Sequence, residues 1–160
     1  AVQQLPQLPN SVLLRDYSEI NVNAGQQMIQ KRGLEHLAQF VQADAFDTQS
    51  IASIDPKPTL GVVSGLYELF SDNDLLRRSL DGLSQAIEKN GYLIYTGQIW
   101  HPQQEFIARA LTSHREGDAW VMRLRSQAEM DALVEAAGFK KVDQNIDDFG
   151  IFTVSVAQKL

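Results

Sequence analysis

The sequence predicts an α/β fold built on a mostly parallel β-sheet that closes with an antiparallel hairpin. Short apolar runs typical of strands alternate with stretches whose apolar residues recur at helical spacing. Strands that alternate with helices usually pair in parallel through right-handed crossovers. Only a few residues separate the last two apolar runs, and a parallel crossover needs about a dozen or more. These two strands are therefore expected to pair as an antiparallel hairpin.

The composition is that of one globular domain covering residues 1–160. Hydrophobic residues make up 44% of the chain and charged residues 21%, values that favour a folded protein over a disordered one. A net charge of -6 and a pI near 5.0 disfavour binding to nucleic-acid phosphates. The sequence has no Cys, which excludes thiolate zinc sites and fits a reducing, cytoplasmic location. No apolar run reaches the roughly 18 residues of a transmembrane segment.

Three strands and one long helix are expected in the first half of the chain. Ser18 is suited to cap the helix at its start, and Gly33 is suited to end it. The first strand is a short apolar run that ends in an acid, which is typical of a buried parallel strand. The expected elements are a strand over 11–16, a helix over 18–31, a strand over 36–44, a loop with one helical turn over 48–58, and a strand over 59–65.

The second half continues the alternation and ends in the hairpin. Pro102 suits the first turn of a helix, and Ser126 with Glu129 three residues later predicts a full capping box. Gly138 is suited to end the helix that this box begins. The expected elements are helices over 72–89, 102–111 and 126–137, and strands over 92–98, 139–145 and 151–157.

Acidic side chains follow the first two strands. Asp16 ends the first strand, and Asp44 follows the second together with Ala45, Phe46 and Asp47. Ligands of open parallel sheets bind beyond the carboxyl ends of the strands. A carboxylate there can accept both hydroxyls of a ribose or the exocyclic amine of adenine, and an aromatic ring can face the base. Taken alone, each acid is better explained as a helix cap or a loop residue.

The loop after the third strand, residues 64–70, is a further candidate site. Gly65 allows a ligand to approach the backbone closely, and Tyr67 can form an apolar wall. Glu68 can serve as a base or hold an amine. The alternative is that this loop packs its aromatic side chains into the core.

Trp100 and His101 follow the fourth strand and are candidates for contacts with a substrate. His101 can act as a general base because histidine titrates near neutral pH, although a lone histidine is more often a surface or helix-start residue. The stretch around Trp120 is a second candidate region for substrate binding. No histidine pattern with ligand spacing is present, so a metal site is not predicted.

Together these segments resemble class I S-adenosylmethionine-dependent methyltransferases. Asp16-Tyr17-Ser18 resembles the acidic motif after that family's second strand, and residues 44–47 resemble the adenine-binding motif after its third. Residues 135–139, Glu-Ala-Ala-Gly-Phe, resemble the entry to its sixth strand. The nearest subgroup is a bacterial methyltransferase family sometimes found fused to an alpha/beta-hydrolase domain, and the resemblance covers essentially the whole chain.

This resemblance implies a Rossmann-like methyltransferase sheet of strand order 3-2-1-4-5-7-6. It also implies S-adenosyl-L-methionine as cofactor and methyl transfer to a small-molecule or lipid-like acceptor, with Trp100 and His101 near that substrate. Methyl transfer depends mainly on positioning, so no general base is obligatory. The residues implied to bind the cofactor are Asp16, Tyr17, Asp44, Ala45, Phe46, Ser64, Gly65 and Tyr67.

One departure from the family pattern is large. The family's first strand carries a glycine-rich loop about 20 residues before the ribose acid. Only 15 residues precede Asp16, and none of them is glycine. We therefore expect the domain to lack its first strand, to leave unpaired sheet edges, and to bind the cofactor poorly on its own. Either the sequence is a portion of a longer protein, or another segment, such as one from a second copy, fills the gap.

Two other functions remain open from the sequence. The domain can be a non-catalytic binding module that has kept the fold and lost the donor site. It can also be an NAD-dependent oxidoreductase, because Asp16 fits the ribose of that cofactor as well. The closing hairpin and the residues after the second strand suit a methyltransferase better.

Overall fold

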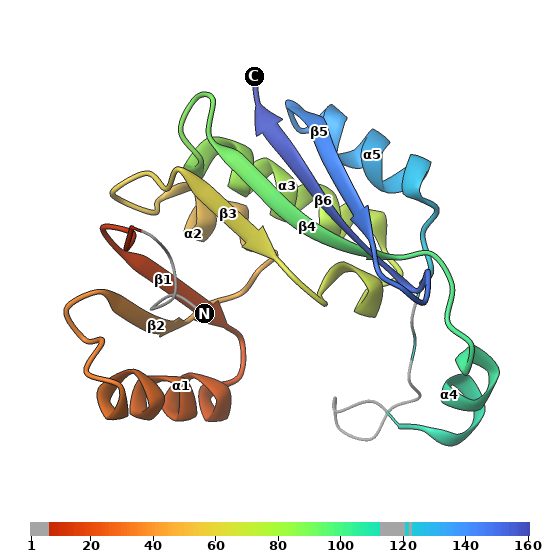
Figure 1. The fold of residues 1–160 in the computed structure, drawn as a ribbon, viewed down its shortest axis with the longest axis horizontal. Coiled ribbons are helices and arrows are strands. Elements are labelled where there is room, and N and C mark those ends of the chain that lie inside the picture. The colour runs from red at the N-terminus through yellow and green to blue at the C-terminus, as the bar shows by residue number, and fades with distance from the viewer. Residues whose placement is uncertain (1–6, 113–120, 122) are drawn as a thin grey trace.

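The computed structural model describes residues 7–112, 121 and 123–160, and its strands form two sheets (Figure 1). The first sheet is a parallel pair, and the second has four strands in the order β3-β4-β6-β5. In the second sheet β3 and β4 are parallel, whereas β4, β6 and β5 pair antiparallel. The strands are β1 (Val12–Asp16), β2 (Ala38–Gln42), β3 (Leu60–Val63), β4 (Tyr92–Gln98), β5 (Phe139–Ile146) and β6 (Phe152–Lys159).

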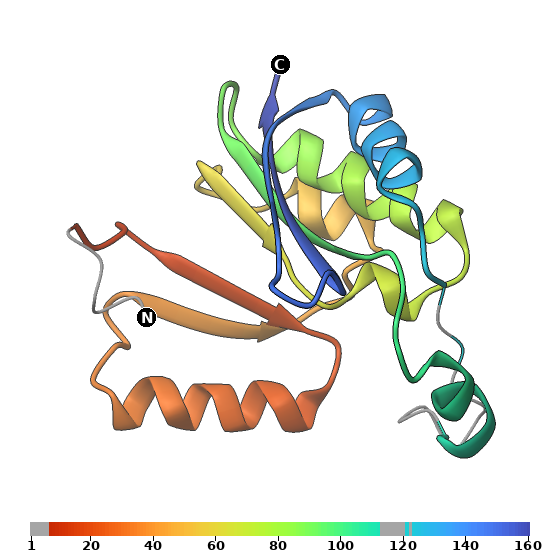
Figure 2. The ribbon, with the colours of Figure 1, turned by 45° about the vertical axis from the view of Figure 1, so that its right-hand side comes forward.

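The helices lie mostly on one side of the larger sheet. In Figures 1 and 2, α2, α3 and α5 cover one face of the four-stranded sheet, and α1 packs against β1 and β2. The helices are α1 (Glu19–Lys31), α2 (Thr48–Ala52), the short 3-10 helix η2 (Tyr67–Leu69), α3 (Asn73–Ala86), α4 (Gln104–Ala110) and α5 (Gln127–Ala136). The predicted α/β fold, with parallel strands and a C-terminal antiparallel hairpin, is confirmed.

The smaller and the larger sheet are neighbours at one edge each, which is β1 in the smaller sheet and β3 in the larger. Both views show β1 and β3 running in the same direction, with no described strand between them (Figures 1 and 2). Among the described residues, the order β2-β1 followed by β3-β4-β6-β5 matches the order 3-2-1-4-5-7-6 without strand 1 (Figures 1 and 2). Consequently β1 and β3 each end their sheet with an edge that no described strand pairs.

Most of the predicted helix ends are confirmed. The Ser18 hydroxyl accepts from the N–H of Asn21 at the start of α1, and the Ser126 hydroxyl accepts from the N–H of Glu129 at the start of α5. Gly33 and Gly138 follow α1 and α5 with φ of 63° and 90°, a conformation that glycine adopts without strain.

The structure corrects several of the predicted boundaries. β2 covers Ala38–Gln42 rather than 36–44, so Asp44 lies just beyond the strand. α4 begins at Gln104, so Pro102 lies before the helix and the prediction that it occupies the first turn is wrong. The reason is a turn in which the N–H of Gln104 bonds to the carbonyl of His101 at 3.1 Å. α3 ends at Ala86 rather than near residue 89, because Ile87 turns to an extended conformation and buries its side chain completely in the core.

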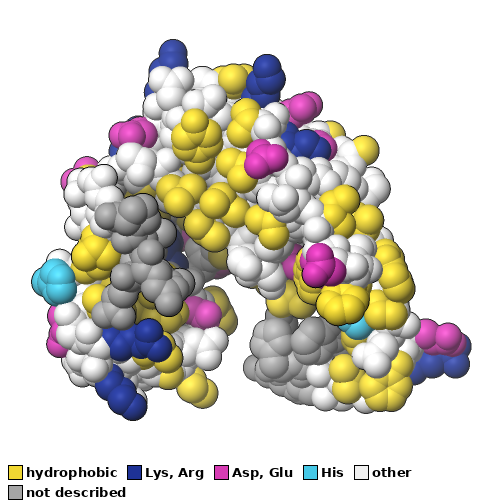
Figure 3. Space-filling view, in the orientation of Figure 1, with side chains coloured by type: hydrophobic (Ala, Val, Ile, Leu, Met, Phe, Trp, Pro, Cys, Tyr) yellow, Lys and Arg dark blue, Asp and Glu magenta, His cyan; other side chains and the backbone are white. Residues whose placement is uncertain are grey.

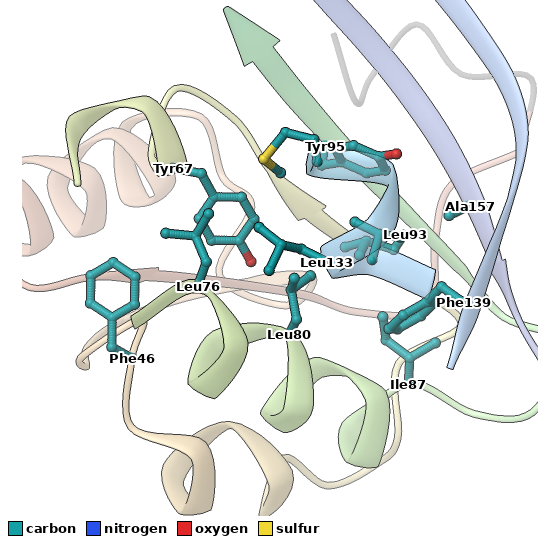
Figure 4. Packing of buried hydrophobic residues seen from close by; sticks show 12 residues of the cluster. Phe46, Tyr67, Leu76, Leu80, Ile87, Leu93, Tyr95, Leu133, Phe139 and Ala157 are labelled. Carbon is teal, nitrogen blue, oxygen red and sulfur yellow. The ribbon is translucent and has the colours of Figure 1, made fainter. Parts of the chain in front are cut away.

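The hydrophobic core fills the space between the four-stranded sheet and its helices. Figure 4 shows Leu80 of α3 and Leu133 of α5 lying toward Leu93 of β4, and Leu76 of α3 beside Tyr67. All five side chains are buried. Burying a leucine-sized side chain contributes about 1.5–3 kcal/mol each, so this cluster fixes the larger sheet against α3 and α5.

The opposite face of this sheet is apolar and exposed. Gly61 faces α3, because an added Cβ would lie 2.8 Å from Ile87, so its neighbour Val62 faces away and is 60% exposed. On β6 the polar Thr153 and Ser155 are buried toward α5 instead. Figure 3 shows hydrophobic side chains gathered over this face. Its exposed apolar residues are Leu60, Val62, Tyr92, Phe152 and Val154.

Candidate functional site

The acidic residues predicted from the sequence lie at one edge of the smaller sheet. Parallel pairing sets Asp16 opposite Gln42, and the N–H of Ala43 donates to the carbonyl oxygen of Asp16 at 2.9 Å. Asp44 is the next residue. The strand ends that carry Asp16 and Asp44 are therefore neighbours at the carboxyl edge of β1 and β2, where ligands of open sheets bind.

Asp16 has a structural role that is visible in its hydrogen bonds. Its Oδ1 accepts from the N–H of Ser18 at 2.7 Å, and its Oδ2 accepts from the side-chain amide of Asn21 at 3.2 Å. These bonds fix the carboxylate at the start of α1. Each carboxylate oxygen can accept more than one hydrogen bond, so both retain capacity for a ligand. The ring of Tyr17, the next residue, is 78% exposed beside it.

Asp44 begins a tight turn that leads into α2. Its Oδ1 accepts from the N–H of Phe46 at 2.8 Å, while its side chain is exposed and Ala45 is half-buried. The ring of Phe46 is only 7% exposed and meets Phe70 edge to face, with ring centroids 4.4 Å apart. Figure 4 shows Phe46 among the core residues. This ring therefore packs as part of the core.

A cation stands beside these acids. The Arg15 guanidinium donates to the carbonyl and the hydroxyl of Ser50 at 3.1 and 2.6 Å, which ties β1 to α2. Burial lowers the pKa of Arg15, and the nearby carboxylates of Asp47 and Asp44 partly restore it. The carboxylates of Asp44 and Asp47 thus lie near a fixed positive charge.

The loop after β3 is exposed at its start and buried at its end. Ser64 and Gly65 are exposed, and Gly65 has a φ of 66° with open space where a side chain would stand. Its N–H donates to the Thr96 hydroxyl of β4 at 2.8 Å. Tyr67 is 2% exposed, its hydroxyl lies 3.0 Å from that of Ser79, and burial raises its pKa. The side chain of Tyr67 therefore belongs to the core, and only the start of the loop is open.

The structure reveals a buried arginine that sequence reasoning missed. Arg125 is 3% exposed and donates to the carbonyls of Tyr67 and Phe70, each at 2.7 Å, and to the side-chain oxygen of Asn73 at 2.7 Å. It therefore holds the backbone of the loop after β3. The segment before Ser126 had no clear pattern, and a single arginine inside it carried no signal of burial.

Glu129 also departs from its predicted role. Instead of completing the capping box, its carboxylate accepts from Arg123 at 2.5 Å and from the Asn73 side chain at 2.9 Å. The start of α5 is thus joined to the start of α3.

The structure describes two of the candidate substrate residues, Trp100 and His101, which follow β4. Trp100 is half-exposed, and the ring nitrogen Nδ1 of His101 accepts from the N–H of Gln103 at 3.1 Å. Trp120 lies outside the described residues. Within the described ranges no group of three or more His, Cys, Asp or Glu side chains could hold a metal ion. No helix among the described residues is long and apolar enough to cross a membrane.

Solved structures identify the class of fold. A S-adenosylmethionine-dependent methyltransferase from Methanosarcina mazei matches 94% of this chain and 82% of its own, with a TM-score of 0.71 and 16% identity. Magnesium protoporphyrin IX methyltransferase from Synechocystis PCC 6803 matches 94% of this chain and 64% of its own, with a TM-score of 0.68 and 14% identity. At such identities the likeness shows the fold alone, which is the methyltransferase fold.

The family follows from the sequence itself. Residues 1–159 match the family described as "Putative methyltransferase", and the chain belongs to that family. An uncharacterized Escherichia coli K12 protein, YnbC, is 57% identical over 148 residues. That match takes in 92% of this chain but 25% of YnbC, so the chain spans about a quarter of the length of this relative.

Proposed function

We propose that this chain is the greater part of a methyltransferase domain that uses S-adenosyl-L-methionine and methylates a small-molecule or lipid-like acceptor. The observation that carries the proposal is the pairing of β1 with β2, which sets Asp16 and Asp44 on adjacent strand ends. Membership of the methyltransferase family supports it. The cofactor supplies an electrophilic methyl group on a sulfonium, and the protein's task is to hold and orient it.

The open positions of the site suit an adenosine group. In this proposal Asp16 accepts the ribose hydroxyls, and the exposed ring of Tyr17 lies against the sugar. Asp44 accepts from the adenine amine, and the N–H of Ala45 donates to a ring nitrogen. Ser64 and Gly65 approach the rest of the cofactor from the loop after β3.

Other predicted site residues act indirectly in this proposal. The buried rings of Phe46 and Tyr67 hold their loops in place from the core rather than touching the cofactor. Trp100 and His101 remain the proposed contacts for the acceptor, because they follow β4 at the same edge of the sheet.

We further propose that a parallel strand with a glycine-rich loop completes the site between β1 and β3. Two facing sheet edges and the exposed side chain of Val62 support this. A longer chain or a second copy can supply the strand. The greater length of YnbC is compatible with a fused second domain, for which an alpha/beta-hydrolase is our proposal.

Equilibrium dialysis of the full-length protein with radiolabelled S-adenosylmethionine tests the function. The proposal expects the ligand to be retained, and to be displaced by S-adenosylhomocysteine but not by NADH. Binding of NADH without S-adenosylhomocysteine would instead indicate an oxidoreductase. Retention of neither nucleotide would indicate a non-catalytic module.

A matched titration of residues 1–160 alone tests the role of the additional strand. We expect much weaker binding of S-adenosylhomocysteine than in the full-length protein. Sub-micromolar affinity in residues 1–160 alone would show that the described strands suffice and would overturn this part of the proposal.

A further inference from the structure

The described part of the protein contains a buried carboxyl group without a hydrogen-bond partner. Glu68 is 6% exposed, and neither of its carboxylate oxygens has a hydrogen-bond partner of normal geometry among the described residues. Its own backbone N–H and the Thr96 hydroxyl are the donors near enough to act on the carboxyl. Gln98 is 4% exposed, and its Oε1 is likewise unpartnered. Buried polar atoms in native proteins are nearly always paired, and an unpaired buried carboxylate is costly. The two carboxylate oxygens of Glu68 and the Oε1 of Gln98 can therefore each accept a hydrogen bond from a ligand.

These oxygens belong to the same edge of the larger sheet. Glu68 lies in η2, directly after β3, and Gln98 is the last residue of the neighbouring parallel strand β4. Thr96 and Gln98 share one face of β4 because they are two residues apart. The Thr96 hydroxyl lies close enough to Glu68 to influence its carboxyl. The unpartnered oxygens thus stand at the carboxyl ends of β3 and β4, where open sheets bind ligands.

Hydrogen bonds from neighbouring residues hold the backbone around Glu68 in place. The N–H of Arg123 donates to the Glu68 carbonyl at 3.0 Å, and Arg125 holds the carbonyl before it, that of Tyr67. The N–H of Gly65 holds the start of the loop to Thr96. Burial raises the pKa of Glu68, and its own backbone N–H, the Thr96 hydroxyl and the charge of Arg125 offset this only in part. The backbone around Glu68 is thus held in place, while the buried carboxylate has no partner of normal geometry among the described residues. A buried acid with a perturbed pKa is typical of a functional group.

We propose that Glu68 and Gln98 receive a primary amino group of a bound small molecule. All three unpartnered atoms accept hydrogen bonds, and an ammonium group carries three N–H donors, whereas a hydroxyl carries one. The inference rests on the proposed methyltransferase function, which offers two sources of the amine. One is an amine of the methyl acceptor, and the other is the α-amino group of the methyl donor.

The chemistry differs between the two sources. In an acceptor, an ammonium nitrogen must lose a proton before it can act as a nucleophile. The N–H bond breaks, its electron pair stays on nitrogen, and the proton forms an O–H bond with the Glu68 carboxylate. In the donor, Glu68 simply pairs with the charged amino group and orients it.

An NMR titration of the full-length protein, with 13C labels on its glutamate carboxyls, tests the inference. Glu68→Gln assigns the Glu68 signal, and the exposed Glu88 is an internal control in the same sample. The probes form two pairs that differ in the amino group. Benzylamine is compared with benzyl alcohol, and S-adenosylhomocysteine is compared with methylthioadenosine, which lacks the amino acid part.

An amine bound at Glu68 should lower the midpoint of its titration by about one pH unit or more, without moving that of Glu88. A shift with benzylamine assigns the site to the acceptor, and a shift with S-adenosylhomocysteine alone assigns it to the donor. Gln98→Met should reduce either shift. Unchanged Glu68 titration with both amines overturns the inference. If benzylamine shifts the Glu68 titration but neither S-adenosylhomocysteine nor methylthioadenosine binds, the amine site is supported and the proposed cofactor is ruled out.

Discussion

The N–H of Ala43 donates a 2.9 Å hydrogen bond to the carbonyl oxygen of Asp16, which joins the carboxyl ends of β1 and β2. Asp44 comes directly after Ala43, so the two acids proposed to hold an adenosine sit on adjacent, hydrogen-bonded strand ends. The Arg15 guanidinium, which bonds to Ser50, ties β1 to α2 next to this edge. Backbone pairing between the two strands thus determines where the side chains of Asp16 and Asp44 lie.

Arg125 should be a major determinant of stability. Arg125→Met removes three hydrogen bonds and leaves the carbonyls of Tyr67 and Phe70 buried without that donor. We expect a loss of about 3 kcal/mol in the free energy of unfolding, measured by urea denaturation. The matched control is Arg77→Met, which breaks an exposed i,i+3 ion pair and should cost less than about 1 kcal/mol. Equal losses in the two variants would contradict this role for Arg125.

The stability of the protein should depend on pH through Glu68. Its pKa is raised in the folded state above the ordinary value of 4.5, so the folded protein binds the proton more tightly than the unfolded chain. Stability should therefore fall as pH rises from about 4.5 through the raised pKa. Glu68→Gln should lack this fall, while Glu88→Gln should retain it. Parallel stability curves for the wild type and Glu68→Gln, recorded by urea denaturation between pH 4 and pH 8, would refute the prediction.

Asp131 should show the opposite dependence on pH. Burial alone raises its pKa, but hydrogen bonds from Lys141, Gln127 and Tyr95 outweigh burial and lower it. The stability from this network is present above the ordinary pKa of 3.8 and is lost as pH falls through the lowered value. We expect Asp131→Asn to cost about 1–3 kcal/mol at neutral pH and progressively less in acid. A cost that stays constant down to pH 2 in denaturant titrations would argue against it.

The edge of β3 that pairs with no described strand should promote self-association of residues 1–160. Val62 is exposed on this edge strand, and exposed apolar edges pair with other chains. Val62→Lys should shift the chain toward monomer in sedimentation experiments, because a charge opposes such pairing. Ile20→Lys, at an exposed position on α1, is the control and should leave the distribution unchanged. If the two variants had the same distribution of monomer and oligomer, the edge of β3 would not be the site of self-association.

The sequence alone predicts the order of elements well. The caps at Ser18 and Ser126 and the closing hairpin depend on residues close together in the chain. Local patterns determine these features, so they can be inferred without a structure. The helix after Pro102 starts later because a local turn at His101 competes with it.

Which side chains are buried by contacts between distant elements was harder to infer from the sequence. Alternation along β6 gives two faces but does not say which is inside, and Thr153 and Ser155 turn inward because Gln127 of α5 offers them partners. The rings of Phe46 and Tyr67 look equally suited to a ligand or to the core. Their burial depends on a core cluster that also draws on β4 and α5, which lie farther along the chain. Arg125 likewise finds its partners more than 50 residues away.

Calorimetric titration of S-adenosylhomocysteine into the full-length protein tests the adenosine site most directly, using the Asp16→Asn and Asp44→Asn variants. Each should bind about tenfold or more weakly than the wild type, because each loses a charged acceptor for the nucleoside. Asp81→Asn, an exposed change on α3, should bind like the wild type. Folded Asp16→Asn and Asp44→Asn variants that both bind with wild-type affinity would contradict an adenosine site at the ends of β1 and β2.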